Sequence, residues 1–323
     1  MRQLHLFGLL GALTLVRCSS APQQSFTVSF PSLTVPAGVE KTQCVVLRLG
    51  NTSKVHIGVI HNTLSSTSHH MIVYRVADTT EQPTPFDCAP FVDTLDPTKG
   101  SPLMITQKKD ELLNLPSGVA YTLEPNQMVR LEMHYINATM SDQTLSGTTT
   151  MMTSHTYHDE ANFLFIGNPD IKIAPNSTFS LGPTFYKLDQ DTFGDAKFFA
   201  VTGHEHQFGT NVTVAAVASA ADPGSPVYDV PNWVWSEPQT VYHDPPFSIP
   251  ANGGFSFTCD WNNTSANTVK FGESANNEMC FFWAYYYPSK GAYVCVHTAY
   301  MGGHDFCCPG AAECGLLQQA AGK

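Results

Sequence analysis

The segment TGHEHQFG, residues 202–209, places His204 and His206 two positions apart between stretches of aromatic and β-branched residues. On a β-strand, residues i and i+2 point to the same face, so both imidazoles would be aimed at one place. Imidazole is a common metal ligand. The pair therefore indicates a metal site, unless it is a coincidence in a chain that has 13 histidines.

Three further places carry side chains that can bind a metal. His69 and His70 are adjacent before the strand-like MIVYRV, and adjacent residues of a regular strand face opposite ways. A shared ion therefore requires a strand end or a kink there. His134 lies on the less apolar face of MVRLEMHYIN, together with Glu132. We expect Glu132 to be a solvated carboxylate, and a hydrogen bond from it to a metal ligand or a water is the alternative. Met279 stands in the aromatic segment NNEMCFFWAYYYP. Taken singly, these places are better explained by surface histidines and by core packing than by a metal site.

The elements that position these residues are predicted to be β-strands. Short segments rich in β-branched and aromatic residues alternate with Gly, Pro and Asn, and helix signals are scarce. This rhythm predicts an all-β sandwich fold. The 323 residues accommodate two such domains. We expect an N-terminal domain over 25–160, a C-terminal domain over 165–300 and a cysteine-rich tail over 301–323.

The N-terminus predicts export. One arginine and a short apolar run precede small residues, which is the pattern of a signal peptide over residues 1–20. The mature protein would then be secreted or periplasmic. A lipid anchor at Cys18 is a weaker alternative, because Arg17 occupies a position where that motif requires a small residue. No other apolar run is long enough to span a membrane.

Composition narrows the range of partners. Charged residues make up only 13% of the chain, the net charge is −11, and no Lys- or Arg-rich run occurs. A nucleic-acid partner is therefore not expected. Hydrophobic residues make up 42% of the chain, which is enough for a substantial core.

Taken together and in order, these places resemble the copper type II ascorbate-dependent monooxygenases, the family of peptidylglycine α-hydroxylating monooxygenase and dopamine β-monooxygenase. The resemblance covers about residues 40–300. SHHM and LEMHY carry it in the N-terminal half. TGHEHQFG, EPQTVY, the segments CDWNN and VKFGESANNEMC, and YYYP carry it in the C-terminal half.

The resemblance implies two tandem antiparallel β-sandwich, jelly-roll-like domains that face each other across a solvent-filled cleft, with one copper ion in each. The electron-accepting copper would be held by His69, His70 and His134. The oxygen-binding copper would be held by the catalytic site residues His204, His206 and Met279. A thioether is a soft ligand that suits Cu(I), whereas a structural zinc site usually has Cys or a further His. Ascorbate would supply the electrons and O2 the oxygen atom.

Departures from the peptide-amidating branch concern the substrate. That branch has an Arg that holds a substrate carboxylate where this chain has Thr202. It also has Asn and Tyr where this chain has Phe281 and Trp283. We therefore expect these three residues to bind a small, uncharged aromatic or aliphatic substrate. Core packing of the two aromatic residues is the alternative, and a cation such as Lys187 or Lys197 could still hold a carboxylate.

The cysteines are expected to form disulfides in an exported chain. By resemblance, Cys44 pairs with Cys88, and Cys259 pairs with Cys280. We expect the remaining four to pair among themselves and to staple the tail: Cys295, Cys307, Cys308 and Cys314.

These observations lead to one function and to alternatives within and outside its class. The function is a copper- and ascorbate-dependent monooxygenase that hydroxylates an activated C–H bond of a small molecule. Within the class, the substrate could instead be a lipid or a secondary metabolite. Outside it, a histidine-rich β-sandwich adhesin without metal would be excluded by tight stoichiometric copper binding, and a copper-binding carrier or scavenger without turnover is the main alternative. Ascorbate-dependent oxygen consumption distinguishes the carrier from the enzyme, because a carrier binds copper without sustained oxygen use.

Overall fold

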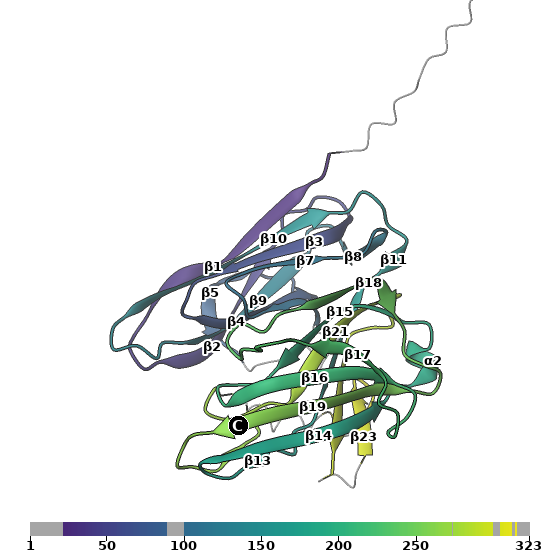
Figure 1. Ribbon diagram of the computed structural model, residues 1–323. Helices are drawn as coiled ribbons and strands as arrows, with labels where there is room; N and C mark the ends of the chain where they lie inside the picture. The colour runs from purple at the N-terminus through teal and green to yellow at the C-terminus, as the bar shows by residue number, and fades with distance from the viewer. Residues whose placement is uncertain (1–21, 89–99, 273, 300–303, 312–313, 315–323) are drawn as a thin grey trace, which may run out of the picture.

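The computed structural model describes residues 22–88, 100–272, 274–299, 304–311 and 314. The predicted signal peptide with Cys18, and most of the tail, lie outside these ranges. The described chain is built almost entirely of β-strands in antiparallel sheets, so the predicted all-β sandwich fold is confirmed. Strands β1–β11, here called the N-terminal sandwich, lie above strands β12–β23, the C-terminal sandwich, in the view of Figure 1.

Two sheets make up the N-terminal sandwich. The first has the order β1-β10-β3-β8-β11, with β7 also paired to β3. Its strands are β1 (Ser25–Val35), β3 (Val55–Leu64), β7 (Asp110–Asn114), β8 (Val119–Leu123), β10 (Gln143–Thr153) and β11 (Asp159–Glu160). The second has the order β5-β2-β9-β4-β6. Its strands are β2 (Glu40–Arg48), β4 (Ser68–Val76), β5 (Gln82–Asp87), β6 (Gly100–Thr106) and β9 (Met128–Ile136).

The C-terminal sandwich has a large sheet of order β18-β15-β21-β12-β22-β23 and a smaller one of order β14-β19-β16-β17. The large sheet consists of β12 (Asn162–Gly167), β15 (Lys197–His204), β18 (Val241–Phe247), β21 (Phe281–Tyr287), β22 (Tyr293–Thr298) and β23 (His304–Cys308). The smaller consists of β14 (Ser177–Lys187), β16 (Gly209–Val217), β17 (Ser225–Asp229) and β19 (Gly254–Asn263). The remaining elements are the strand pair β13 (Lys172–Ile173) and β20 (Val269–Lys270), and the short helix α2 (Gln190–Phe193).

The large C-terminal sheet is buried on both faces. Along β21, Phe281, Trp283 and Tyr285 join the apolar core of the N-terminal sandwich, whereas the residues between them face the C-terminal core. The backbone N–H of Ile105 in β6 donates to the Tyr285 hydroxyl at 3.2 Å. A strand buried on both faces reads as a continuous apolar run, which explains the sequence FFWAYYY. The two sandwiches therefore share an apolar interface.

Four disulfides bridge the described chain. They join Cys44 to Cys88, Cys259 to Cys280, Cys295 to Cys307, and Cys308 to Cys314. The first two are the pairs that the resemblance implied. The last two confirm that the remaining cysteines pair among themselves. Cys307 and Cys308 end β23, so the first part of the predicted tail is an edge strand of the large sheet.

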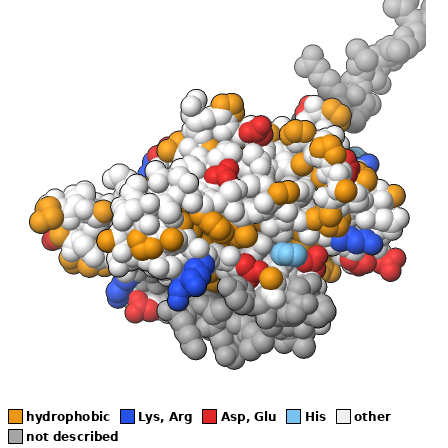
Figure 2. All heavy atoms as spheres, turned by 60° about the horizontal axis from the view of Figure 1, so that its bottom comes forward, with side chains coloured by type: hydrophobic (Ala, Val, Ile, Leu, Met, Phe, Trp, Pro, Cys, Tyr) orange, Lys and Arg blue, Asp and Glu red, His pale blue; other side chains and the backbone are white. Residues whose placement is uncertain are grey.

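The surface shown in Figure 2 carries charges that are spread out. Lys and Arg side chains lie apart from one another, with Asp and Glu side chains on the same face and apolar side chains scattered between them. The described side chains of this face form no continuous basic surface. No helix in the described ranges is long and apolar enough to cross a membrane.

Candidate metal centre

Strands β4 and β9 pair with an irregularity at His69. Ser68 pairs with Tyr135 and His70 with His134, so His69 is an extra residue on β4. A bulge of this kind breaks the strict alternation of side chains. The ring centroids of His69 and His70 lie 5.2 and 5.0 Å from that of His134, and 5.3 Å from each other. The kink that two adjacent histidines need for a shared ion is therefore present.

Strands β15 and β21 bring the second set together. Their antiparallel register pairs His204 with Phe281. His206, two residues beyond β15, hydrogen-bonds Glu278 and Asn277, the two residues that precede Met279. The ring centroids of His204 and His206 lie 5.1 Å apart, and Met279 is buried in the core that faces the N-terminal sandwich. The two histidines and the segment that leads to Met279 therefore lie at one end of the large sheet.

Glu278 ties the loop of His206 to the segment of Met279. Its buried carboxylate accepts the backbone N–H groups of His206 and Phe208, each at 2.8 Å, and the indole N–H of Trp261 at 2.9 Å. Burial raises the pKa of Glu278 to about 7, although these hydrogen bonds act in the opposite direction. Three donors on one carboxylate fix the backbone of His206 against the residue that precedes Met279.

The histidines of the two sandwiches form a single buried cluster. The ring of His69 lies 6.5 Å from that of His204 and 6.0 Å from that of His206, and His70 lies 6.5 Å from His204. The resemblance implied two sets that face each other across a solvent-filled cleft. In the structure the two sets adjoin, and all five rings, including that of His134, are at most 5% exposed.

Burial favours the neutral form of four of these imidazoles, those of His69, His70, His204 and His206. It lowers the pKa values of His69, His70 and His204 well below the usual value. The repulsion that a proton on one ring would exert on a proton on the next ring lowers them further. Burial likewise lowers the pKa of His206 to about 4. A neutral imidazole keeps the lone pair that a metal needs, so the cluster is ready to bind a cation at neutral pH.

Hydrogen bonds also determine which ring nitrogen can bind a metal. Nδ1 of His204 lies 2.9 Å from Oε1 of Gln107, and Nδ1 of His206 lies 3.2 Å from the carbonyl oxygen of Asn277. Both partners are acceptors, so both Nδ1 atoms carry the hydrogen. Nε2 of His204 is buried and has no hydrogen-bond partner among the described residues. Metal-binding histidines usually donate their other ring N–H in this way.

Glu40 orients the ring of His134 in the same way, by accepting a hydrogen bond from one ring nitrogen. Nε2 of His134 lies 3.1 Å from the carboxylate, which leaves Nδ1 for a metal. Glu40 also accepts the N–H of Ala275 at 3.0 Å and the hydroxyl of Ser274 at 3.1 Å, both from the C-terminal sandwich. The hydrogen bond from His134 holds the pKa of Glu40 at about 2. An ionised carboxylate therefore supports the imidazole.

The spacing of the rings fits bound metal ions. Two imidazoles bound to one ion at about 2.0–2.1 Å and at a tetrahedral angle have centroids about 5 Å apart. The observed separations within each set are 5.0–5.3 Å. As the side chains stand, no three His, Cys, Asp or Glu residues in the described ranges are arranged to hold a metal. Binding of an ion by these residues would require the imidazole rings to rotate about their side-chain bonds. The thioether of Met279 is a further possible ligand that is not among those residue types. Neutral imidazoles with one thioether suit copper.

The predicted substrate residues lie beside His204. Trp283 and Phe281 are buried on the face of β21 that adjoins the histidines, and the Trp283 ring centroid is 5.9 Å from that of His204. Phe165 stacks on both, with centroids 4.8 Å from Phe281 and 6.3 Å from Trp283. These residues form an aromatic wall that also belongs to the core. The indole nitrogen of Trp283 is buried without a hydrogen-bond partner among the described residues.

Thr202 is tied to a buried carboxylate. Its hydroxyl lies 2.9 Å from that of Thr240, which donates its hydrogen to Glu111 at 2.8 Å. Thr202 is therefore the donor to Thr240 and has no hydrogen left for a substrate. Burial raises the pKa of Glu111 to about 7. Lys187 and Lys197, considered as anchors for a carboxylate, are both exposed, and Lys197 stands at the start of β15, remote from the histidines.

The prediction for Glu132 is wrong. Its carboxylate is 2% exposed rather than solvated, and it accepts a hydrogen bond from the Tyr74 hydroxyl at 3.1 Å. The physical reason is that β9 is central in its sheet and that its outer face, which carries His134, is covered. Sequence reasoning also missed Gln107 and Glu40, whose contacts with the histidines span 97 and 94 positions.

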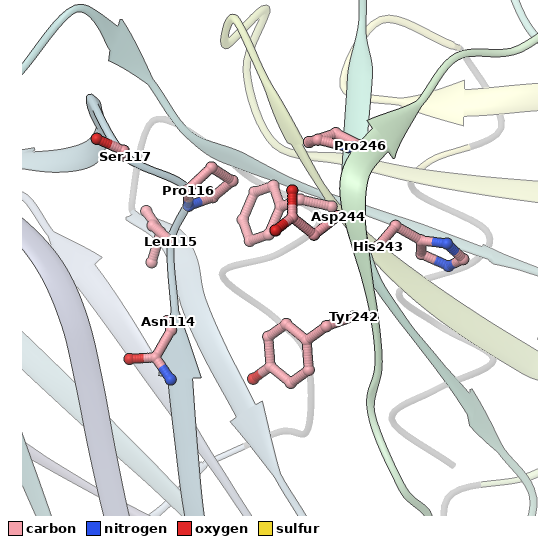
Figure 3. Close-up of a pocket in the computed structure, with 9 residues that line it drawn as sticks. Asn114, Leu115, Pro116, Ser117, Tyr242, His243, Asp244 and Pro246 are labelled. Atoms are coloured by element: carbon pink, nitrogen blue, oxygen red, sulfur yellow. The ribbon is translucent and has the colours of Figure 1, made fainter.

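A separate hollow of about 370 Å³ lies between residues 114–117 and β18 (Figure 3). Tyr242 crosses its mouth, and its hydroxyl donates to the carbonyl of Leu112 at 2.6 Å. His243 points away from the hollow, and its ring nitrogen Nε2 hydrogen-bonds the carbonyl of Val227 at 2.9 Å. None of the five clustered histidines lines this hollow, so it is distinct from the candidate metal centre.

Comparisons with solved structures give weak likenesses. The major capsid protein P2 from bacteriophage PM2 is 9% identical, with a TM-score of 0.36 over 84% of this chain and 100% of that one. N-glycanase F (PNGase F) is 10% identical, with a TM-score of 0.30 over 82% of this chain and 94% of that one. No curated protein sequence matches the chain.

A family model matches the C-terminal sandwich. Residues 162–302 match the model of the copper type II ascorbate-dependent monooxygenase, C-terminal domain. This range includes His204, His206 and Met279. The match thus supports the copper type II ascorbate-dependent monooxygenase family for this chain.

Proposed function

We propose that this protein is a secreted or periplasmic monooxygenase that uses copper, ascorbate and O2 to hydroxylate an activated C–H bond of a small, uncharged apolar or aromatic substrate. One observation carries the proposal. His204 and His206 each donate Nδ1–H to a fixed acceptor, and both lie, with Met279, within the range that matches the family model.

The ligand sets divide between the sandwiches. His69, His70 and His134 would hold one copper ion. His204, His206 and Met279 would hold the other. Bound copper supplies the one-electron chemistry with dioxygen that amino-acid side chains lack, and ascorbate is the reductant.

The protein's own groups prepare these sites. Gln107 and the carbonyl of Asn277 orient the rings of His204 and His206. Glu40 remains ionised and supports His134. The aromatic wall of Phe165, Phe281 and Trp283 keeps water from the side of His204, which protects reactive species from side reactions.

The surroundings of Thr202 support an uncharged substrate. A substrate carboxylate normally binds the fork of a guanidinium, and loss of such a contact costs on the order of 2–3 kcal/mol, or roughly a hundredfold in binding. Thr202 donates its single hydrogen to Thr240, and the carboxyl group of Glu111 lies behind that pair. An anionic substrate would therefore find no free hydrogen-bond donor at Thr202, and it would be repelled by the partly ionised carboxyl group of Glu111.

Metal analysis of the copper-loaded protein tests the proposal first. We expect two copper ions per chain, one in His204→Ala, and two in the matched control His155→Ala, because His155 is exposed and remote from the cluster. Ascorbate-dependent oxygen consumption is then measured with a series of neutral aromatic and aliphatic compounds, and products are identified by mass spectrometry. One copper or fewer in the loaded wild-type protein contradicts the two-site proposal.

A copper carrier or scavenger without turnover is the second candidate. Phe281 and Trp283 are each 2% exposed and stack on Phe165, so the aromatic wall is packed as a core would be. A carrier would bind two copper ions and consume oxygen with ascorbate only at the slow rate of autoxidation, whatever compound is added. A compound that accelerates oxygen use and is recovered with one added oxygen atom excludes it.

A further inference from the structure

Gln107 connects the two sandwiches at the histidine cluster. It follows β6 directly, is 2% exposed, and belongs to the N-terminal sandwich. Its side-chain oxygen lies 2.9 Å from Nδ1 of His204, and its amide nitrogen donates to the carbonyl of Trp235 at 3.5 Å. Both partners belong to the C-terminal sandwich, although no sequence motif contains Gln107.

The two contacts of Gln107 determine its orientation. A backbone carbonyl can only accept, so the amide nitrogen must face Trp235 and the amide oxygen must face His204. An amide oxygen also only accepts, so the hydrogen of the neutral imidazole is placed on Nδ1. Nε2 of His204 then carries the lone pair, and it has no hydrogen-bond partner among the described residues.

His206 provides the internal comparison. Its Nδ1 hydrogen-bonds the carbonyl of Asn277, which belongs to the same sandwich and lies two residues before Met279. The tautomer of His206 is therefore set within the C-terminal sandwich, whereas that of His204 is set from outside it. The ring of His204 has the right tautomer only when the sandwiches are docked as they are here.

We propose that Gln107 is a positioning residue for the C-terminal metal site: it fixes the tautomer and orientation of His204 from the opposite sandwich. The inference rests on the proposed function only for the identity of the metal. The tautomer itself is a property of the metal-free protein, so it can be measured whether or not copper binds.

The first measurement is the histidine tautomer by long-range ¹H–¹⁵N NMR of metal-free protein labelled at histidine, at neutral pH. We expect His204 to carry its hydrogen on Nδ1 in the wild type and in Gln107→Glu, which keeps an oxygen acceptor. We expect Gln107→Leu, which has no acceptor and cannot bind copper, to lose the single Nδ1–H tautomer. Gln207→Leu is the matched control, because Gln207 is exposed and hydrogen-bonds Asn276 rather than a ring nitrogen.

The second measurement is copper affinity at each site. Loss of a group that orients a metal ligand typically lowers affinity about 10- to 100-fold. We expect this loss at one of two sites in Gln107→Leu, substantial recovery in Gln107→Glu, and none in Gln207→Leu. An Nε2–H tautomer of His204 in the wild type overturns the proposal even if Gln107→Leu fails to fold. Wild-type tautomer and affinity in a folded Gln107→Leu overturn it as well.

Discussion

Acid should destabilise the metal-free protein through His206, and comparison with His206→Asn isolates the effect. Burial lowers the pKa of His206 from 6.5 to about 4. Below about pH 6.5 the unfolded chain takes up a proton on this ring, but the folded protein does not until about pH 4. The contribution of the neutral His206 ring to the free energy of unfolding is therefore complete above about pH 6.5 and is lost as the pH falls towards about 4.

The size of the loss follows from the two pKa values. Between pH 7 and pH 5 the unfolded imidazole becomes protonated over roughly 1.5 pH units, while the folded one stays neutral. At about 1.4 kcal/mol per unit, the free energy of unfolding falls by about 2 kcal/mol. Glu111 and Glu278 act in the opposite direction, because burial raises both pKa values to about 7 and folded-state protonation then stabilises the protein as the pH falls.

The opposing glutamates are the reason for measuring a difference rather than a single pH curve. Denaturant unfolding of wild type and His206→Asn, both with chelator, gives the difference in unfolding free energy at pH 7 and at pH 5. We expect the wild type to lose about 2 kcal/mol relative to the variant between these values. The exposed control His155→Asn should show no such change. A wild-type-minus-variant difference that is the same at both pH values would falsify the burial argument.

Three further predictions follow from the same end of the large sheet. Removing the Cys259–Cys280 disulfide, which closes a span of 21 residues, should lower the free energy of unfolding by about 3 kcal/mol in denaturant titrations, and an unchanged midpoint argues against it. Glu278→Gln should cost about 1–3 kcal/mol, because an amide cannot satisfy all three buried donors; equal stability shows that the donors find other partners. Met279→His should keep two copper ions per chain but lose the copper–sulfur signal in X-ray absorption, whereas the exposed control Met140→His should retain it; a sulfur signal that persists in Met279→His removes this residue from the site.

Local pattern predicted the strands and the residues that share a face. The alternation around MVRLEMHYIN placed His134 opposite the apolar face, and β9 has this arrangement. A shared ion at the adjacent His69 and His70 required a strand end or a kink, and the structure has a bulge at that point. Such features depend on neighbours along the chain or across one strand pair, so a single sequence contains them.

Contacts between the sandwiches could not be predicted in this way. Gln107 and Glu40 reach their partners only when two separately folded surfaces dock, and no periodicity in the sequence encodes that docking. The error at Glu132 has a related cause, because a strand whose second face is covered has the same alternation as one whose second face meets water. The docking also explains why the two histidine sets adjoin instead of facing a cleft.

The bulge at His69 makes the number of imidazoles depend on strand length as well as on residue identity. Deleting this one residue would restore an unbroken register between β4 and β9 and leave His70 opposite His134, with the His69 ring missing. Substituting it keeps the extra position and removes only a side chain. Insertions and deletions in this segment are therefore a different kind of change from substitutions, because one residue more or less changes which imidazoles lie side by side.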